Sequence, residues 1–432
     1  MNNSGKTPYS EQTSEQRKEL LEQLRGQYRA ECARGLKLNM SRGIPGADQL
    51  DLSLGMLTVL GSDSELESDG VDCRSYGQLT GLDEVKQLYS EMLGIPKENM
   101  IIGGNSSLNM MYDETVRLML YGVPGYTPWS KLGKIRFLCP SPGYDRHFAI
   151  SEQFGMELVK IDMTPYGPDM DQVEEAVKDP AVKGMWCVPK YSNPEGITYS
   201  DETVRRLAAM QTAAGDFRVF WDNAYAIHGL YGDDDDQLLN VFEEAKKQGT
   251  EDRFLIFAST SKITFPGSGI SVIAASDGNI QEITRRLSFQ TIGYDKLNML
   301  RHVRFFGSYA GMREHMKKHG DVLRPKFEAV LAIFDRDLGG LGIADWTKPK
   351  GGYFISLNVT DGCAKRVYEL AAEAGVKLTE AGATFPYKLD PRDRNLRIAP
   401  SYPPKEKLIE AANILCLCVR IAALEKLEKG NQ

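Results

Sequence analysis

Two apolar runs flank a single lysine in the stretch Phe254-Leu-Ile-Phe-Ala-Ser-Thr-Ser-Lys262-Ile-Thr-Phe-Pro-Gly-Ser-Gly269, which continues as Ile270-Ser-Val-Ile-Ala-Ala-Ser276. Short apolar runs bounded by glycine, proline and serine predict buried strands, with Lys262 in the turn between them. A partly desolvated lysine loses its proton more readily and can form a Schiff base with a carbonyl. A lysine that reaches from a turn into water is the alternative, and this stretch alone favours it.

The composition describes a large globular protein. The chain has 432 residues, 42% of them hydrophobic, which suggests more than one domain or one large α/β domain with an appendage. The formal net charge is -7, and no basic stripe favours a nucleic acid. No apolar run has the length of a membrane span, and the polar N-terminus lacks the apolar segment of a secretory signal. The seven cysteines show no zinc-ligand spacing, so we expect a cytoplasmic protein with buried thiols.

Strands and helices alternate through the first two thirds of the chain. Apolar strand patterns, most of them followed by a helical pattern, begin at Asn99, Arg136, Glu157, Gly184 and Phe217. This alternation predicts a mostly parallel sheet with helices on both faces, and the later part of the chain reads as α+β. We therefore predict an α/β fold with a large cofactor-binding domain over residues 51–310. A smaller α+β domain would comprise residues 1–50 together with 311–432.

Two local predictions concern the segments on either side of this alternating region. The residues Arg42-Gly-Ile-Pro-Gly-Ala-Asp48, followed by Leu50-Asp-Leu-Ser-Leu-Gly55, indicate a loop that enters a short strand. Near residues 297–319 the pattern indicates one long helical run.

Polar side chains follow one strand after another. Tyr144, Asn193, Asp222 and Tyr225 each come just after a predicted strand. In open α/β sheets ligands bind at the carboxyl ends of the strands, so these residues are candidates for one site.

A further candidate is a glycine and serine turn. The strand that begins at Asn99 runs into Gly103-Gly-Asn-Ser-Ser107 and then a long amphipathic helix. The unpaired N–H groups and the dipole of a helix start both favour an anion, so this turn suits a phosphate. Capping of the helix by Asn105 or Ser106 is the simpler interpretation, and both can hold.

Taken together, these residues match the requirements of a pyridoxal phosphate site: a lysine, an aspartate, a phosphate cradle, polar donors and an aromatic ring. The motifs follow in the order Asn193-Pro-Glu-Gly196, Asp222-Asn-Ala-Tyr225, Ser259-Thr-Ser-Lys262 and Asn395-Leu-Arg397. In these motifs the chain resembles the fold-type-I pyridoxal phosphate enzymes, class I/II aminotransferases. It looks closest to a divergent bacterial subgroup of aspartate aminotransferases, from about Leu50 to the C-terminus.

The resemblance implies a role for each matched residue around pyridoxal 5'-phosphate. Lys262 would hold the cofactor's aldehyde as a Schiff base and then shuttle the substrate's proton. Asp222 would pair with the ring nitrogen, Asn193 and Tyr225 would hydrogen-bond the phenolic oxygen, and Tyr144 would stack on the ring. The phosphate would be held by Asn105, Ser106, Ser107, Ser259 and Ser261.

The resemblance also implies how substrate and a second subunit meet the site. Arg397 would clamp the substrate α-carboxylate with a bidentate fork, with Asn193 beside it. Gly55 matches the N-terminal segment that closes over substrate. Tyr76 matches a tyrosine that reaches the phosphate of the neighbouring subunit, so a homodimer with shared active sites is implied.

One departure concerns the phosphate. Members of the family commonly carry an arginine seven or eight residues after the lysine, where it pairs with the phosphate, and here those positions are Gly269 and Ile270. The helix start and the hydroxyls must then contribute more, or another basic residue replaces the arginine. Neutral hydrogen bonds are about half as strong as charge-assisted ones, so we expect weaker retention of the cofactor.

The predicted activity is transfer of an amino group from an L-amino acid to 2-oxoglutarate by a ping-pong mechanism. The subgroup resemblance favours aspartate, whose second carboxylate needs a cation of its own, and Arg42 and Arg146 are candidates. Another activity on the same scaffold is the alternative: a transaminase for a different amino acid, or a β-eliminating lyase. A pyridoxal-binding regulator is disfavoured because the segment before Leu50 is short for a DNA-binding domain.

Overall fold

An eight-stranded sheet forms the centre of the structure. The computed structural model describes residues 6–429, apart from the side chain of Asp233. The strand order is β4-β11-β10-β9-β8-β5-β6-β7. The strands are β4 (Met100–Gly103), β5 (Arg136–Ser141), β6 (Glu157–Thr164), β7 (Gly167–Pro168), β8 (Val182–Cys187), β9 (Arg218–Asp222), β10 (Phe254–Ser259) and β11 (Ser271–Ala274).

The sheet is mostly parallel, as predicted. Strands β6, β5, β8, β9 and β10 pair in parallel with their neighbours, whereas β11 is antiparallel to β10 and β4, and β7 is antiparallel to β6. Every residue of β4, β9, β10 and β11 is buried. These strands are therefore continuous apolar runs, because both of their faces are covered by helices.

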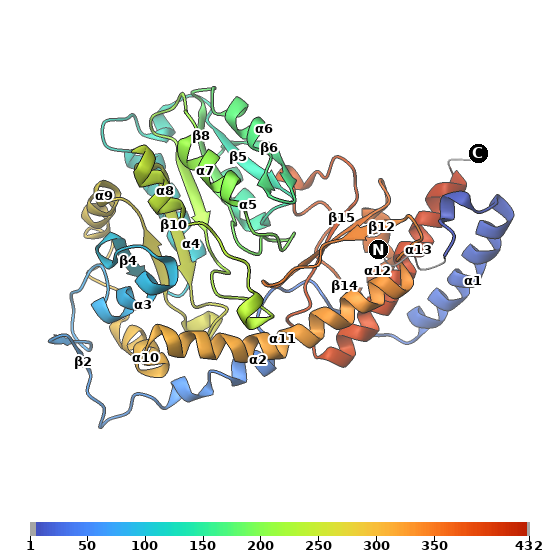
Figure 1. The fold of residues 1–432 in the computed structure, drawn as a ribbon, viewed down its shortest axis with the longest axis horizontal. Coiled ribbons are helices and arrows are strands. Elements are labelled where there is room, and N and C mark those ends of the chain that lie inside the picture. The colour runs from blue at the N-terminus through green and yellow to red at the C-terminus, as the bar shows by residue number, and fades with distance from the viewer. Residues whose placement is uncertain (1–5, 430–432) are drawn as a thin grey trace.

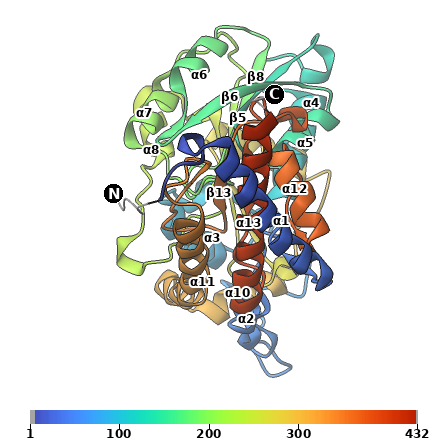
Figure 2. The same cartoon turned by 90° about the vertical axis from the view of Figure 1, so that its right-hand side faces the viewer.

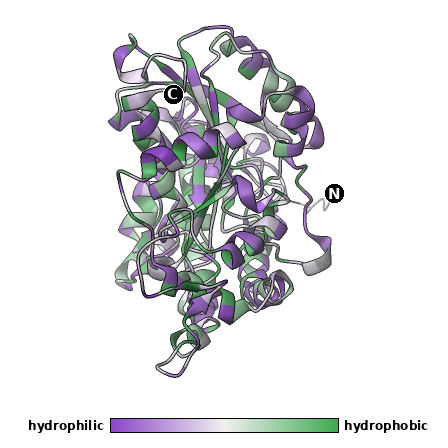
Figure 3. Ribbon diagram, turned by 90° about the vertical axis from the view of Figure 1, so that its left-hand side faces the viewer, coloured by the Kyte–Doolittle hydropathy of each residue, from purple (hydrophilic) through white to green (hydrophobic). Residues whose placement is uncertain are grey.

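The helices that complete the fold are α1 (Ser14–Ala33), α2 (Ala47–Asp51), α3 (Asp83–Leu93), α4 (Ser107–Tyr121), α5 (Asp145–Gln153), α6 (Met170–Ala176), α7 (Asp201–Ala209), α8 (Val241–Gln248), α9 (Asp277–Leu287), α10 (Lys296–Phe306), α11 (Tyr309–Asp337), α12 (Ala364–Glu373) and α13 (Lys405–Lys429). Apolar residues of α3, α6, α7 and α8 pack on one face of the large sheet, and those of α4, α5 and α9 pack on the other. Polar and apolar residues alternate along the outer helices (Figure 3). Side-chain caps such as Ser200, Asn240 and Ser276 fix where several helices begin.

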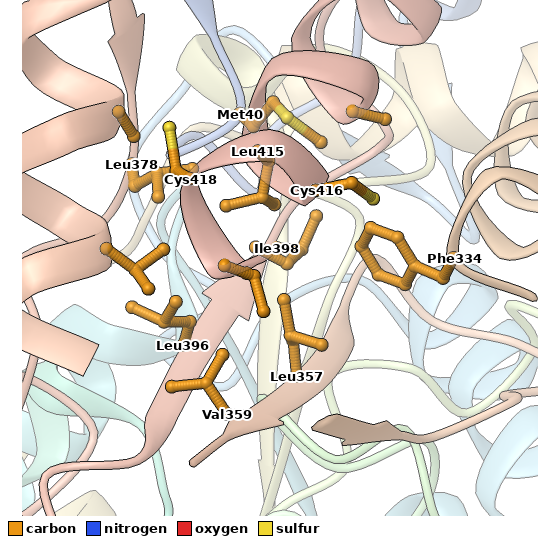
Figure 4. Close-up of a cluster of buried hydrophobic side chains, with 14 of the residues drawn as sticks. Met40, Phe334, Leu357, Val359, Leu378, Leu396, Ile398, Leu415, Cys416 and Cys418 are labelled. Carbon is orange, nitrogen blue, oxygen red and sulfur yellow. The ribbon is translucent and has the colours of Figure 1, made fainter. Parts of the chain in front are cut away.

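A second, smaller layer lies beside the large sheet (Figure 1). Its antiparallel sheet has the order β12 (Ala344–Trp346), β13 (Ile355–Val359), β15 (Asn395–Ile398), and a parallel pair joins β1 (Leu38–Asn39) to β14 (Val376–Lys377). The apolar cluster drawn in Figure 4 connects these strands to α11 and α13. Helices α1 and α13 lie side by side, so the two ends of the chain meet in this layer (Figure 2).

Helix α11 belongs to both layers. Met312 and Met316 near its start pack in the cluster beneath the large sheet, and Phe327 and Phe334 near its end pack in the cluster of the small layer. Pro325 lies inside the helix between these two contact regions. A hairpin formed by β2 (Glu67–Ser68) and β3 (Val71–Asp72) projects from the end of the molecule that is farthest from α1 and α13 (Figure 1).

Two local predictions were wrong. Residues 50–55 form no strand: α2 ends at Asp51 and a 3-10 turn, Leu54–Leu57, follows. The buried side chains of Gln49 and Ser53 bond to histidines of α11, which holds this segment in a turn rather than an extended conformation. The single run near residues 297–319 is two helices, because Gly307 adopts φ 69° and Ser308 caps the next helix.

None of the helices within residues 6–429 is both long enough and apolar enough to span a bilayer. Of the seven cysteines, Cys32 is partly exposed and the other six are buried, and all are free thiols. Buried thiols are what the scattered cysteines predict.

Candidate active site

Lys262 lies in the turn between β10 and β11, at the carboxyl end of the central strands. Its Nζ is 4.9 Å from the centroid of the Tyr225 ring. Burial lowers the pKa of the Lys262 ammonium, and the negative charge of Asp222 opposes that shift. The amine therefore loses its proton more readily than a lysine in water, which a nucleophilic lysine requires.

Asp222 ends β9 and is almost fully buried. Its Oδ2 lies 3.1 Å from Nε2 of His147, and the His147 ring stacks on Trp186 with centroids 4.5 Å apart. Among the described residues, Oδ1 of Asp222 has no hydrogen-bond partner although it is buried. A buried carboxylate oxygen without a donor is costly, so this atom fits the N–H of a protonated ring nitrogen.

His147 was not singled out in the sequence, although it lies three residues after Tyr144. It belongs to the first turn of α5, and that helix brings it beside the end of β9. A helical spacing of three could have suggested that His147 and Tyr144 share one face, and their rings are in contact at 4.8 Å. Its bond to Asp222 depends on the sheet order, which no local pattern encodes.

The predicted aromatic and amide residues surround the same point. Tyr225 and Asn193 are buried, and Tyr144 is half-buried. Burial raises the pKa of Tyr225, and it raises that of Tyr144 to about 12, so both phenols stay protonated near neutral pH. Protonated phenols can donate hydrogen bonds or stack on a ring without adding charge.

The predicted phosphate cradle forms from two turns that are bonded to each other. Ser261 donates from Oγ to the carbonyl of Asn105 at 2.7 Å, and Ser259 donates to Oγ of Ser261 at 3.1 Å. Helix α4 begins at Ser107, and Ser106, at its N-cap position, makes no side-chain capping bond. The Ser106 side chain therefore does not cap the helix. The Ser106 hydroxyl and the first N–H groups of α4 stay available to an anion.

The missing arginine has a structural reason. A Cβ at Gly269 would lie 3.1–3.2 Å from Oγ1 of Thr260, the carbonyl of Asn105 and the N–H of Ser261, and Ile270 is buried in the core. A side chain at position 269 would therefore require its neighbours to move, and a basic side chain at position 270 would have to replace a core residue.

A basic residue stands behind the same turn. The Asn298 amide donates to the carbonyls of Ser268 and Gly269 at 3.0 and 2.9 Å, and Arg301 donates to Oδ1 of Asn298. The Nε of Arg301 is buried and has no partner among the described residues. Arg301 is therefore a candidate for the positive charge that Gly269 cannot carry.

Arg397 projects from β15 and is 9% exposed, so it is not a surface residue. Its Nη1 lies 2.8 Å from Oδ1 of Asp145 and 3.3 Å from Oδ1 of Asn193, and its Nη2 donates to Oγ1 of Thr379 at 3.3 Å. Its Nε is buried and unpartnered among the described residues. The guanidinium is thus oriented by neighbours and retains donors for a substrate carboxylate. The pairing with Asp145 joins residues 252 positions apart and was not anticipated.

The remaining predicted residues lie at the surface. Tyr76 is 84% exposed, and its loop is held by Lys296, whose Nζ donates to the carbonyls on either side of Tyr76. Gly55 is exposed in the 3-10 turn after α2. Arg42 and Arg146 are both exposed, and the Arg42 guanidinium lies 5.6 Å above the Tyr402 ring.

The sequence also did not predict a buried polar network behind Lys262. Tyr353 donates to the backbone carbonyl of Lys262 at 3.2 Å, and His315 lies 2.9 Å from that of Ile263. Gln49 joins the two arms, because its amide contacts both Tyr353 and His319, which lies 3.1 Å from His315. The spacing of the two histidines by one helical turn on α11 was the only local signal.

Comparisons with known proteins agree with this geometry. A family model described as aspartate amino-transferase matches residues 12–431. An aspartate aminotransferase of Corynebacterium glutamicum is 45% identical over 394 residues, which cover 91% of each chain. The crystal structure of an aspartate transaminase from the same species matches with a TM-score of 0.93 and 44% identity, covering 95% of this chain and 97% of the other.

A more distant structure shares the fold. An α-aminoadipate aminotransferase from Thermus thermophilus, solved with N-(5'-phosphopyridoxyl)-L-leucine, matches with a TM-score of 0.73 at 20% identity and covers 94% of this chain and 98% of its own. The fold is that of the pyridoxal phosphate-dependent aminotransferases. This chain belongs to the aspartate aminotransferase family and is an aminotransferase.

Proposed function

We propose that this enzyme moves the amino group of L-aspartate to 2-oxoglutarate with pyridoxal 5'-phosphate, in two half-reactions that share one site. The observation that carries the proposal is the pair formed by Lys262, whose pKa is lowered by burial, and Asp222, whose Oδ1 is buried without a donor. An aldehyde and a ring N–H are the two groups that such a pair accommodates. The 45% identity to the aspartate aminotransferase of Corynebacterium glutamicum supports the choice of aspartate.

The residues around this pair fit the rest of the cofactor. Asp222, fixed by His147, would hold the ring nitrogen in its protonated form. Asn193 and Tyr225 would donate to the phenolic oxygen, and Tyr144 would cover one face of the ring. The phosphate would be held by the α4 start and by the side chains of Asn105, Ser106, Ser107, Ser259 and Ser261. When bound, pyridoxal phosphate supplies a ring that withdraws electrons from the substrate α-carbon.

The protein's own groups would then position substrate and move one proton. Arg397 would take the α-carboxylate with the donors that Asp145 and Thr379 leave available. The Lys262 amine would remove the proton from the substrate Cα and return it to the cofactor carbon that carries the aldehyde. Its lowered pKa suits this task, because a general base works best when its pKa is near the working pH.

For the side-chain carboxylate of aspartate we propose Arg42. Ser41, next to it, accepts from Thr379 at 3.3 Å, and Thr379 in turn accepts from Arg397. Arg42 therefore follows directly on a chain of contacts that starts at the α-carboxylate site. Arg146, exposed on α5, follows Asp145, which pairs with Arg397 at 2.8 Å, so it is the second candidate.

Three further proposals concern the oligomeric state, the division into domains and the location in the cell. The high exposure of Tyr76, together with that of Phe289 and Ile292 at 85% and 62%, favours a homodimer in which Tyr76 reaches the partner's phosphate site. The division into domains over residues 51–310, and 1–50 with 311–432, is supported by the apolar clusters, most of whose residues fall within one of these parts; Tyr225 of the first and Met312 of the second are among those that cross the boundary. A cytoplasmic location is proposed from the free thiols.

The test is a panel of L-amino acids offered to the purified enzyme with 2-oxoglutarate, scored for glutamate and for the new keto acid. Aspartate should give the highest kcat/KM, and Lys262→Ala should lose both turnover and the visible absorbance of the bound cofactor. Turnover by Lys262→Ala would refute the assignment of the lysine. Continued keto-acid release, beyond one equivalent per active site, without any added 2-oxoglutarate would favour a lyase instead.

A further inference from the structure

The turn that carries Lys262 lacks two backbone hydrogen bonds. Thr260 to Thr264 form a single turn of helical spacing, in which the N–H of Thr264 donates to the carbonyl of Thr260 at 2.9 Å. In a continuing helix the carbonyl of Lys262 would accept from residue 266, but that residue is Pro266, which has no N–H. No backbone N–H in the described part of the chain donates to the carbonyl of Lys262 or to that of Ile263. Both carbonyls therefore need donors from side chains or solvent.

Two side chains supply such donors. The hydroxyl of Tyr353, which is fully buried, donates to the carbonyl of Lys262 at 3.2 Å, and Nε2 of His315 lies 2.9 Å from the carbonyl oxygen of Ile263. Burial raises the pKa of Tyr353 and lowers that of His315, so near neutral pH the phenol keeps its proton and the imidazole is uncharged. A neutral imidazole has one N–H, and because the Ile263 carbonyl can only accept, that N–H is on Nε2.

Both donors contact the N-terminal segment that leads to Gly55. The Gln49 amide of α2 donates to the Tyr353 hydroxyl at 2.9 Å, and Oγ of Ser53 lies 3.3 Å from Nε2 of His315. Gln49 and Ser53 are both fully buried, and α2 lies against α11 (Figure 1). The segment that the family resemblance expects to close over substrate is therefore bonded, through one side chain on each path, to the donors that hold the lysine turn.

We propose that Tyr353 and His315 are positioning residues for Lys262. They fix its backbone and so the direction in which its amine points, and Gln49 supports them from the segment of Gly55. This inference rests on the proposed role of Lys262 as the lysine that binds the cofactor's aldehyde. The amine stands at the end of a flexible four-carbon chain, so a shift of the backbone moves it directly. A displacement of about 1 Å in a reacting group can cost about a hundredfold in rate.

The test measures how fast the cofactor-free enzyme takes up pyridoxal 5'-phosphate, followed by the visible absorbance that the bound cofactor acquires. Tyr353→Phe removes the donor but keeps the ring, whose centroid lies 5.9 Å from that of Tyr225. It should slow uptake by about tenfold or more and lower kcat for aspartate by a similar factor. KM for aspartate should change by less than about twofold, because the hydroxyl acts on Lys262 and not on the groups that bind the amino acid.

The matched control is Tyr28→Phe. The Tyr28 hydroxyl also donates to a backbone carbonyl, that of Leu370 at 2.9 Å, but it does so in the small layer. Tyr28→Phe should therefore leave the rate of uptake, kcat and KM unchanged. Slowing by the same factor in Tyr28→Phe and Tyr353→Phe would show a general effect of losing a tyrosine hydrogen bond, and the inference would be overturned.

Substitutions at His315 separate positioning from stability. His315→Gln offers an amide N–H in place of Nε2 and should keep uptake within about threefold of the wild type, whereas His315→Leu should slow it about tenfold or more. Gln49→Leu should slow uptake by about threefold or more, because the Tyr353 hydroxyl loses the donor that orients it. A purely structural role for these residues would lower the urea midpoint and leave the uptake rate of the folded protein unchanged.

Three results would overturn the inference: wild-type uptake by Tyr353→Phe, equal slowing in His315→Gln and His315→Leu, or wild-type uptake by Gln49→Leu. Lys262→Ala tests the proposed function separately, because it should acquire none of the visible absorbance. If Lys262→Ala acquires that absorbance, the assignment of the lysine is wrong. If it does not, and Tyr353→Phe still takes up the cofactor at the wild-type rate, the positioning role alone is refuted.

Discussion

Acid should destabilise this protein through its buried histidines. His302 and His319 are buried, and burial lowers their pKa values to about 4 and about 3. The pKa of a histidine in the unfolded chain is about 6.5. A group whose folded pKa is depressed in this way leaves stability intact above pH 6.5, and stability falls as the pH drops towards the folded value, because the unfolded chain takes up the proton first.

The magnitude follows from the pKa values. At pH 5 the solution is about 1.5 units below the unfolded pKa, while both folded histidines are still mostly neutral, so each costs about 2 kcal/mol at 1.36 kcal/mol per unit. The two together should remove about 4 kcal/mol of unfolding free energy between pH 7.5 and pH 5. Glu195 acts in the opposite direction, because burial raises its pKa to about 7. A comparison with a variant that keeps Glu195 therefore isolates the histidines.

The assay is urea unfolding of wild type and of the double variant His302→Gln/His319→Gln, each at pH 7.5 and pH 5. Both proteins should be cofactor-free and at one concentration, because ligand binding and subunit association add apparent stability. The wild type should lose about 4 kcal/mol more than the variant over this range. Equal losses in the two proteins would show that these histidines are not held neutral by burial.

Other substitutions probe the site itself. Asp222→Ala should change the free energy of unfolding by no more than about 1 kcal/mol but lower kcat by at least about a hundredfold. Retained activity would refute the pairing of Asp222 with the ring nitrogen. Arg397→Ala should raise KM for all α-amino acids alike, whereas Arg42→Ala should raise it about tenfold or more for aspartate and leave alanine unaffected. Arg301→Ala should weaken retention of pyridoxal phosphate during dialysis without changing the affinity for pyridoxal, which lacks the phosphate. The matched control is Arg304→Ala, because Arg304 is an exposed neighbour that pairs with Glu84.

The places of many candidate site residues in the fold could be predicted from short motifs, because each motif lies at the end of a strand that its own residues specify. Asn193, Asp222 and Lys262 follow apolar runs, and a mostly parallel sheet brings such strand ends to one edge. The candidate phosphate turn could be located for the same reason: strand, glycines and helix start are adjacent in the chain. Local pattern and tertiary position coincide at these residues.

What escaped prediction depends on contacts between distant segments. Arg397 and Asp145 come from different layers, and nothing near either residue encodes their pairing. The turn at residues 50–55 was read as a strand because Leu50, Leu52 and Leu54 alternate with other residues, as in a strand. Burial of Gln49 against His319 overrides that pattern, since an amide satisfied in the core fixes the backbone around it.

Pro325 gives helix α11 a mechanical property of its own. A proline has no N–H, so the carbonyl of Asp321 loses its usual helical donor and the helix bends there at the least cost. Met312 and Met316 pack in the large layer, and the residues from Leu323 onwards pack in the small layer. If the small layer moves towards a bound substrate, helix α11 can bend at Pro325 while the apolar clusters at both of its ends stay packed. Arg397 would then move with the small layer, and Lys262 would stay with the large one.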